Sequence, residues 1–177
     1  MAYPKITVNT SKVLAVVASD SIPIPSPNAV PLSGTTTATT TNKLVDVGAD
    51  FSNVVVGDIV YNTTDNTVAT VSEVETSTIL VLSADIFTSP EDYIVFQAGP
   101  IFEQRIDSSS GCLLYVGSNE ATMDVAKSYV DVKVKTVNGD DIVFSNFPVG
   151  EYLPVQITNL FSTGTDAAAR FNSVAIW

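Results

Sequence analysis

The chain has 177 residues, of which 45% are hydrophobic and 15% are charged, and its mean hydropathy is +0.28. This length and balance indicate a globular protein with room for one large domain or two small ones, and they exclude a largely disordered chain. The formal net charge of −11 argues against nucleic acid as a direct partner, and the lack of histidine removes the commonest general base and metal ligand.

Residues 1–42 are expected to form one strand followed by an extended arm. The apolar run at 13–18 is shorter than the apolar region of a signal peptide, so it is predicted to be a strand. The chain also lacks an apolar run long enough to span a membrane, so we expect a soluble protein. Four prolines then favour extended chain: Pro23, Pro25, Pro27 and Pro31. With the Thr-rich stretch at 35–41, this segment is either a linker or an arm along a neighbouring subunit.

Residues 43–99 are expected to form a small β module. Short β-branched runs alternate with polar turn clusters at the spacing typical of sandwiches and barrels. The stretch "YNTTDNTV" at 61–68 is predicted to be a hairpin loop. In the following run, Ala69 and Val71 share one face with Glu73, while Thr70 lies on the other.

Residues 100–177 are expected to form a β-sandwich-like module built around a hairpin. Asn138-Gly139 predicts a two-residue type I′ turn, which would place Val134 opposite Val143 and Lys135 opposite Ile142.

The stretch "FPVG" at 147–150 is predicted to be a tight turn, and a strand should follow at 151–161. Pro154 makes this strand an edge or a bulged strand, because proline has no N–H for the ladder. Short helical stretches are expected only at 120–130 and 163–171. The predicted fold class is therefore all-β, with antiparallel sandwich or barrel modules.

No catalytic, cofactor or metal site is predicted. The carboxylate pairs at 73/75, 91/92 and 140/141 are expected to be solvated rather than buried as acid–base catalysis requires. Loops 61–67 and 138–141 are rich in oxygen ligands but do not match the EF-hand spacing. Cys112 lies among apolar neighbours and is predicted to be a small buried hydrophobic residue. These features indicate a protein that is not an enzyme.

The sequence at 130–177 resembles the C-terminal signature of small structural proteins of tailed bacteriophages and gene transfer agents. The matching positions are Val132, Lys133, Val134, Gly139, Asp140, Phe144, Asn146, Pro148, Gly150, Leu153, Pro154, Val155, Thr163, Gly164, Thr165 and Trp177. The stretch at 44–87 is similar to a second module that recurs in phage virion proteins. The segment 166–170 departs from the pattern, which has a shorter Thr/Ala segment there.

The resemblance implies a virion structural protein, either a capsid decoration (cement) subunit or a head-spike base subunit. It implies self-assembly, with a trimer favoured, binding to the major capsid protein at the capsid surface, and synthesis in the cytoplasm of the host bacterium. Two alternatives remain open: a tail or neck component, and a carbohydrate- or receptor-binding β module. The predicted interface residues are Pro23, Pro25, Pro27, Pro148, Gly150, Tyr152, Leu153, Pro154, Val155, Phe161 and Trp177.

Overall fold

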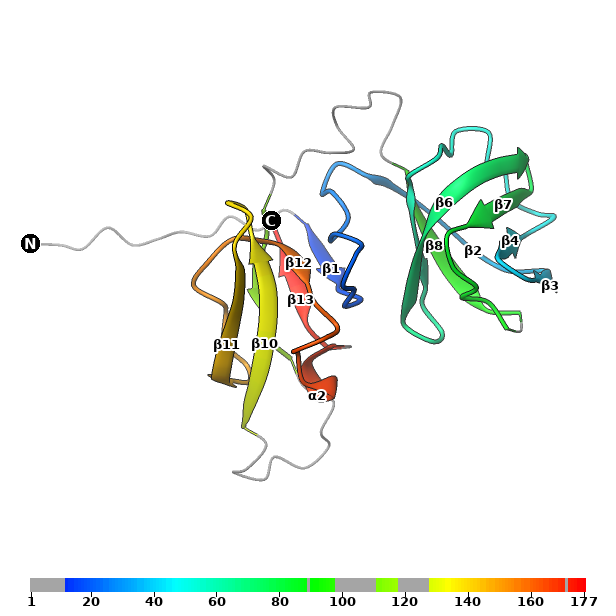
Figure 1. Ribbon diagram of the computed structural model, residues 1–177. Helices are drawn as coiled ribbons and strands as arrows, with labels where there is room; N and C mark the ends of the chain where they lie inside the picture. Colours follow the sequence, from blue (N-terminus) through cyan, green and yellow to red (C-terminus); the bar gives the residue numbers. More distant parts are fainter. Residues whose placement is uncertain (1–11, 89, 98–110, 118–127, 171) are drawn as a thin grey trace, which may run out of the picture.

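The computed structural model describes residues 12–88, 90–97, 111–117, 128–170 and 172–177. Every strand pairing in these residues is antiparallel, and the helical structure is a single turn, α2 (Ala167–Arg170). The predicted all-β class is confirmed, and so is the short helical turn expected within 163–171. Figure 1 shows two β units side by side.

The first unit, the seven-stranded unit, is a sheet with the strand order β2-β8-β5-β6-β7-β4-β3. Its strands are β2 (Val30–Thr35), β3 (Ala38–Thr40), β4 (Lys43–Val45), β5 (Ile59–Asn62), β6 (Thr67–Thr76), β7 (Ile79–Leu82) and β8 (Asp92–Gln97). The first residues of β6 pair with β5 and the rest pair with β7, with two register shifts on the β7 side. Shifts of this kind bend a strand, and the sheet curls into a half-barrel (Figure 1).

The core of the seven-stranded unit is an apolar cluster of its buried side chains, Leu44, Phe51, Val60, Ala69, Val71, Leu80 and Val95 among them. Ala69 and Val71 are buried while Glu73 is exposed, so the predicted alternation holds up to the first register shift. The predicted hairpin loop is confirmed at 63–66, between β5 and β6. Asn62 stabilises it, because its Oδ1 accepts hydrogen bonds from the backbone N–H groups of Thr64 (2.9 Å) and Asp65 (3.1 Å).

The second unit, the two-sheet unit, contains sheets with the orders β1-β13-β9 and β11-β10-β12. Its strands are β1 (Val13–Ala15), β9 (Leu113–Tyr115), β10 (Tyr129–Thr136), β11 (Asp141–Pro148), β12 (Ile157–Leu160) and β13 (Val174–Ile176). Residues 150–157 link the sheets by running beside β9. In this stretch Leu153 N–H donates to the Leu114 carbonyl at 2.9 Å. Ile157 and Cys112 exchange two backbone hydrogen bonds.

The core of the two-sheet unit follows from the alternation along β10. Val130, Val132 and Val134 are buried on one face, and Lys133 and Lys135 lie on the other. Burial of each valine stabilises the unit by on the order of 1.5–3 kcal/mol.

The register of the β10–β11 hairpin differs from the predicted one by one residue. Val134 pairs with Ile142, and Lys135 pairs with Asp141. Gly139 has a φ of 92°, whereas Asn138 is not among the residues with positive φ, so a type I′ turn is excluded. The loop instead has three residues, 137–139, with glycine in the left-handed position. The predicted turn was wrong because Val137 N–H donates to the Gln156 carbonyl, a contact that local sequence does not reveal.

The chain reversal predicted at 147–150 begins later than expected. β11 continues through Pro148, which an edge strand tolerates, and the turn follows at Val149 and Gly150. The strand predicted at 151–161 is interrupted by a bend at Pro154 and Val155, and regular pairing resumes only in β12.

The helical stretch predicted at 120–130 lies mostly outside the described residues. Its last two residues, Tyr129 and Val130, begin β10 instead, because they pair with Pro148 and Phe147 across the hairpin.

Residues 12–42 contribute to both units. β1 pairs with β13, and residues 16–24, here called the strap, run on along β12, where Ser19 N–H and Ile24 N–H donate to the carbonyls of Leu160 and Thr158. The chain then crosses to the seven-stranded unit as β2 and β3 (Figure 1). Within the described residues, no helix has the length and apolar character needed to cross a bilayer.

A small apolar cluster lies where the two units meet. Tyr61 and Phe96 of the seven-stranded unit pack edge to face, with ring centroids 4.9 Å apart. Leu14 and Val17, at the start of the chain, pack against the same cluster. The N-terminal stretch therefore belongs to the contact between the units as well as to the two-sheet unit.

Candidate interaction surfaces

The buried carboxylates of the seven-stranded unit have structural partners. Asp46 accepts hydrogen bonds from the Tyr93 hydroxyl at 2.8 Å and from Gly48 N–H at 2.9 Å. Burial, together with this carboxylate, raises the pKa of Tyr93 above its ordinary value. Asp58 accepts from Val55 N–H at 2.9 Å and holds the turn before β5. These hydrogen bonds hold the backbone at Gly48 and Val55 in place, and the Tyr93 hydroxyl stays protonated and acts as a hydrogen-bond donor.

Glu91 was expected to be solvated, and this expectation is wrong. It is only 5% exposed, and its carboxylate accepts a hydrogen bond from Asn62 Nδ2 at 2.8 Å and longer ones from Thr88. Its backbone N–H donates to Thr36 Oγ1 at 2.9 Å. The carboxylate can be buried because polar groups from distant parts of the chain donate hydrogen bonds to it. The residues next to Glu91 in the sequence resemble an exposed turn and give no sign of these partners.

The remaining acid and thiol candidates lie where the sequence predicted. Glu73, Glu75, Asp140 and Asp141 are exposed, and Lys135 pairs with Asp141 at 3.2 Å. Cys112 is 2% exposed, and burial raises the pKa of its thiol to about 12, so it is not a reactive thiolate. Among the described residues, no three Cys, Asp or Glu side chains gather as a metal site would require.

The predicted interface residues at 148–155 are divided between the surface and the core. Tyr152 is 54% exposed, and Pro148 and Pro154 are also exposed, whereas Leu153 is fully buried and Val155 packs against the core. The segment 148–155 therefore contains both exposed residues and a buried residue, Leu153, that packs in the core and holds the segment in place.

Gly150 has a φ of 90° and its N–H donates to the Val116 carbonyl at 2.8 Å, so it shapes the turn. Gly150 therefore fixes the shape of the turn. After this turn the chain places Tyr152 beside Tyr115. The two tyrosine rings lie edge to face, with centroids 5.4 Å apart.

The other predicted interface residues lie in separate places. Phe161 is buried under Lys133, whose Nζ lies 4.7 Å from the ring centroid. Trp177 is half-buried at the junction of the units. Among the prolines, Pro23 is exposed, Pro25 is buried and Pro27 is half-buried.

An apolar groove of about 210 Å³ lies at the junction, and it is the larger of two hollows there. Its lining includes Val13, Leu14, Pro27, Pro31, Phe96 and Trp177. Lys12 also lines the groove, and its Nζ donates to the carbonyls of Pro27 and Ala29. Sequence reasoning identified Pro27 and Trp177 but missed the residues of β1 and β8, which only the packing of the two units brings beside them.

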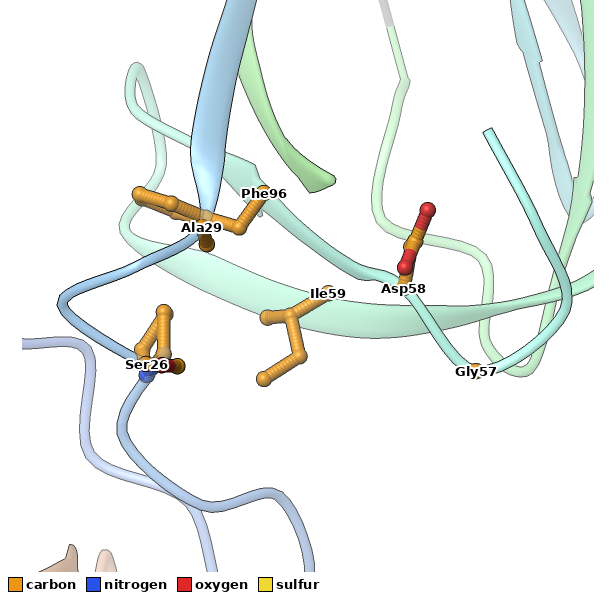
Figure 2. A pocket seen from close by; sticks show the side chains of 7 residues that line it. Ser26, Ala29, Gly57, Asp58, Ile59 and Phe96 are labelled. Atoms are coloured by element: carbon orange, nitrogen blue, oxygen red, sulfur yellow. The ribbon is translucent and has the colours of Figure 1, made fainter. Parts of the chain in front are cut away.

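The second hollow measures about 30 Å³, which is room for about one water molecule. Figure 2 shows Ser26 and Ala29 on one side of it, and Gly57, Asp58 and Ile59 on the other. This site is too small for a substrate.

Comparison with known proteins gives no relative for the chain. No protein-family model matches it, and neither a curated protein nor a solved structure shows significant similarity.

Proposed function

We propose that this protein is a structural component of a phage virion, a capsid decoration or head-spike base subunit that self-assembles and binds the major capsid protein. The proposal rests on the resemblance of residues 130–177 to such proteins. It is supported by what the pattern residues do in the fold. A tail or neck component is the other position in the virion that the same resemblance allows.

The supporting observation is that the pattern residues form the framework of the two-sheet unit. Asn146, Gly150 and Gly164 have φ values of 52°, 90° and 89°, a backbone region that few residue types adopt without strain. Leu153 is a core residue, and Thr165 Oγ1 accepts a hydrogen bond from Lys133 N–H at 2.9 Å. Residues required by a fold are the ones that a resemblance between structural proteins would retain.

Immunogold labelling of intact phage particles with an antibody against this chain tests the proposal. Label spread over the capsid surface is expected for a decoration protein, and label at the vertices for a head-spike base. Label confined to the tail or neck would identify the protein as a tail or neck component instead. Unlabelled particles would overturn the proposal.

Binding to capsids provides a second measurement. The purified protein should co-sediment with capsids stripped of their accessory proteins, and the bound amount should saturate. Capsids that already carry their full set of accessory proteins are the control and should bind little more.

One observation favours a second candidate, a carbohydrate- or receptor-binding module. Tyr152 is exposed and braced by Tyr115, and exposed aromatic rings are platforms for flat apolar ligand faces. A glycan array probed with the wild-type protein and with Tyr152→Ala tests this candidate. Signals lost in the variant would support it, and an array without signals would exclude binding to the arrayed sugars.

A further inference from the structure

The seven-stranded sheet carries apolar side chains on both of its faces. Val60 of β5 pairs with Ala69 of β6 and with Val95 of β8, and all three belong to the core of the seven-stranded unit. The residues on either side of them along the strands point to the opposite face, because the side chains of a strand alternate. Five of these residues are also apolar or aromatic, and we call them the back-face cluster: Ile59, Tyr61, Val68, Ile94 and Phe96.

The back-face cluster forms one surface across three strands. Ile59 pairs with Phe96, and Tyr61 pairs with both Val68 and Ile94. Directly opposed residues of an antiparallel pair lie on the same face and contact one another. An antiparallel sheet with one face on a core ordinarily has polar side chains on its other face, so this apolar second face requires a cover.

The cover comes from the N-terminal stretch. Leu14, Val17 and Ala29 pack on the back-face cluster, and Figure 2 shows Ala29 beside Phe96. Under this cover Tyr61 is 3% exposed and Phe96 is 7% exposed. Leu14 belongs to β1, which pairs with β13, and Val17 belongs to the strap, which is bonded to β12. The contact on the back face is therefore a junction between the two units.

This junction is packed less completely than the core on the other face of the same sheet. The Tyr61 hydroxyl is buried and has no hydrogen-bond partner of good geometry among the described residues, whereas the Tyr93 hydroxyl donates to Asp46 at 2.8 Å. The groove of about 210 Å³ and the smaller hollow both lie at the junction, and Phe96 lines both. A buried hydroxyl without a partner and unfilled space both weaken a contact, and water would satisfy the hydroxyl if the contact opened.

The connection between the strap and β2 provides a hinge. It spans residues 25–29, which contain a turn where Ala29 N–H donates to the Ser26 carbonyl at 3.0 Å. Lys12 Nζ donates to the carbonyls of Pro27 and Ala29, which ties the connection to the start of β1. The seven-stranded sheet consists of β2 to β8 alone, so rotation about residues 25–29 leaves its strand pairings and those of the two-sheet unit unchanged.

We propose that the junction opens in solution, as the two-sheet unit swings away from the back-face cluster about residues 25–29 and carries Leu14 and Val17 with it. The closed form is the major one, and both cores stay intact when the junction opens. Units of one chain ordinarily move relative to one another unless the contact between them is extensive. Opening exposes the five side chains of the back-face cluster to solvent. It does not depend on the position of the protein in a virion.

Hydroxyl-radical footprinting of the full chain, analysed by mass spectrometry, tests the opening because it measures the access of solvent to individual side chains. Tyr61 and Tyr93 provide an internal comparison, since both are nearly buried in the same unit but lie on opposite faces of its sheet. Phe96 and Phe51 provide a second comparison of the same kind. In the wild type, each residue of the back-face cluster should be oxidised at least about tenfold faster than its counterpart in the core.

Two variants should shift the opening in opposite directions. Leu14→Ser combined with Val17→Ser weakens the contact and should speed oxidation of Phe96 about tenfold, with Phe51 unchanged. Tyr61→Phe removes the hydroxyl without a partner and should slow oxidation of Phe96 by up to about tenfold.

Val47→Ser combined with Val143→Ser is the matched control. These valines are 75% and 48% exposed, one in each unit and neither in the junction cluster. The control should leave the oxidation of Phe96 unchanged. Circular dichroism establishes whether each variant is folded. If the serine variant at Leu14 and Val17 fails to fold, alanine at both positions replaces it and should still speed oxidation of Phe96 at least about threefold.

Three results would overturn the proposal. Tyr61 and Phe96 could be oxidised as slowly as Tyr93 and Phe51 in the wild type and in every folded variant, which would mean a fixed junction. Oxidation of the back-face cluster and of the core could rise together, which would mean unfolding of the whole unit. Amide exchange at 13–16 could be as fast as the exposure of the cluster, which would mean that β1 separates from β13 instead.

Discussion

Asp20 ties the strap to the loop that follows β12. Its Oδ1 accepts a hydrogen bond from Thr163 N–H at 2.8 Å, and its Oδ2 accepts one from the Thr163 hydroxyl at 2.7 Å. These bonds favour the ionised carboxylate and lower the pKa of Asp20 below its ordinary value. A single exposed side chain thus joins two segments 143 positions apart in the sequence.

Replacement Asp20→Ala should destabilise the two-sheet unit modestly, by about 0.5–1 kcal/mol. Because the pKa is lowered on folding, the contribution of Asp20 is present above the pKa of the unfolded chain, about 4, and is lost as the pH falls through the lower folded value. Urea unfolding at pH 7 and at pH 2.5 measures it. The wild-type and variant curves should differ at pH 7 and converge at low pH.

Asp65→Ala is the matched control, since Asp65 is exposed in the loop before β6. The difference in unfolding free energy between the wild type and Asp65→Ala should be about the same at pH 7 and at pH 2.5. A penalty for Asp20→Ala that persists unchanged at pH 2.5 would contradict the assignment to the ionised carboxylate.

At the scale of elements, the register of the β10–β11 hairpin depends both on its turn residues and on a contact outside the hairpin. The Asn138-Gly139 pair locates the reversal, and Gly139 supplies the positive φ. The loop nevertheless includes Val137, whose N–H is bonded to Gln156 outside the hairpin. Along β11, a second irregularity lies near Asn146, whose N–H donates to Asp131 Oδ1 at 2.8 Å.

The three-residue loop predicts unequal effects of two alanine substitutions. Gly139→Ala should cost about 1–2 kcal/mol, because alanine is strained in the left-handed region, whereas Asn138→Ala should change stability by less than about 0.5 kcal/mol. Chemical denaturation of the two variants measures the difference. Equal, large losses would indicate a type I′ turn, in which both positions have positive φ.

At the scale of the whole molecule, the N-terminal stretch joins the two units. Val16 is buried in the core of the two-sheet unit, while Leu14 and Val17 pack on the cluster around Tyr61. Tyr61 is 3% exposed, and its hydroxyl is buried without a hydrogen bond of good geometry, although the Val17 backbone lies close. Burial therefore raises the pKa of Tyr61 above its ordinary value.

Tyr61→Phe should leave stability unchanged or raise it by up to about 1 kcal/mol, because it removes a buried polar atom that lacks a partner. Tyr93→Phe is the contrasting variant and should be destabilising, since it breaks the bond to Asp46. Thermal unfolding of both variants beside the wild type tests this. A loss of more than about 1 kcal/mol in Tyr61→Phe would mean that its hydroxyl is bonded in solution.

The sequence by itself determined the features that depend on neighbouring residues. Alternation of apolar and polar residues in β6 and β10, and turn residues at 61–68 and 138–139, predict an all-β chain with these hairpins. The apolar surroundings of Cys112 predict its burial. Such patterns can be read locally, because side chains of a strand alternate between faces and few residue types tolerate positive φ.

The tertiary structure alone decided the features that depend on distant residues. The burial of Glu91 needs Asn62 and Thr36, and the hairpin register needs the carbonyl of Gln156. The apolar cluster where the two units meet combines Leu14 and Val17 with Tyr61 and Phe96, which lie far apart in the sequence. A sequence pattern identifies which residues are apolar, but only the packing of the sheets determines which of them lie together.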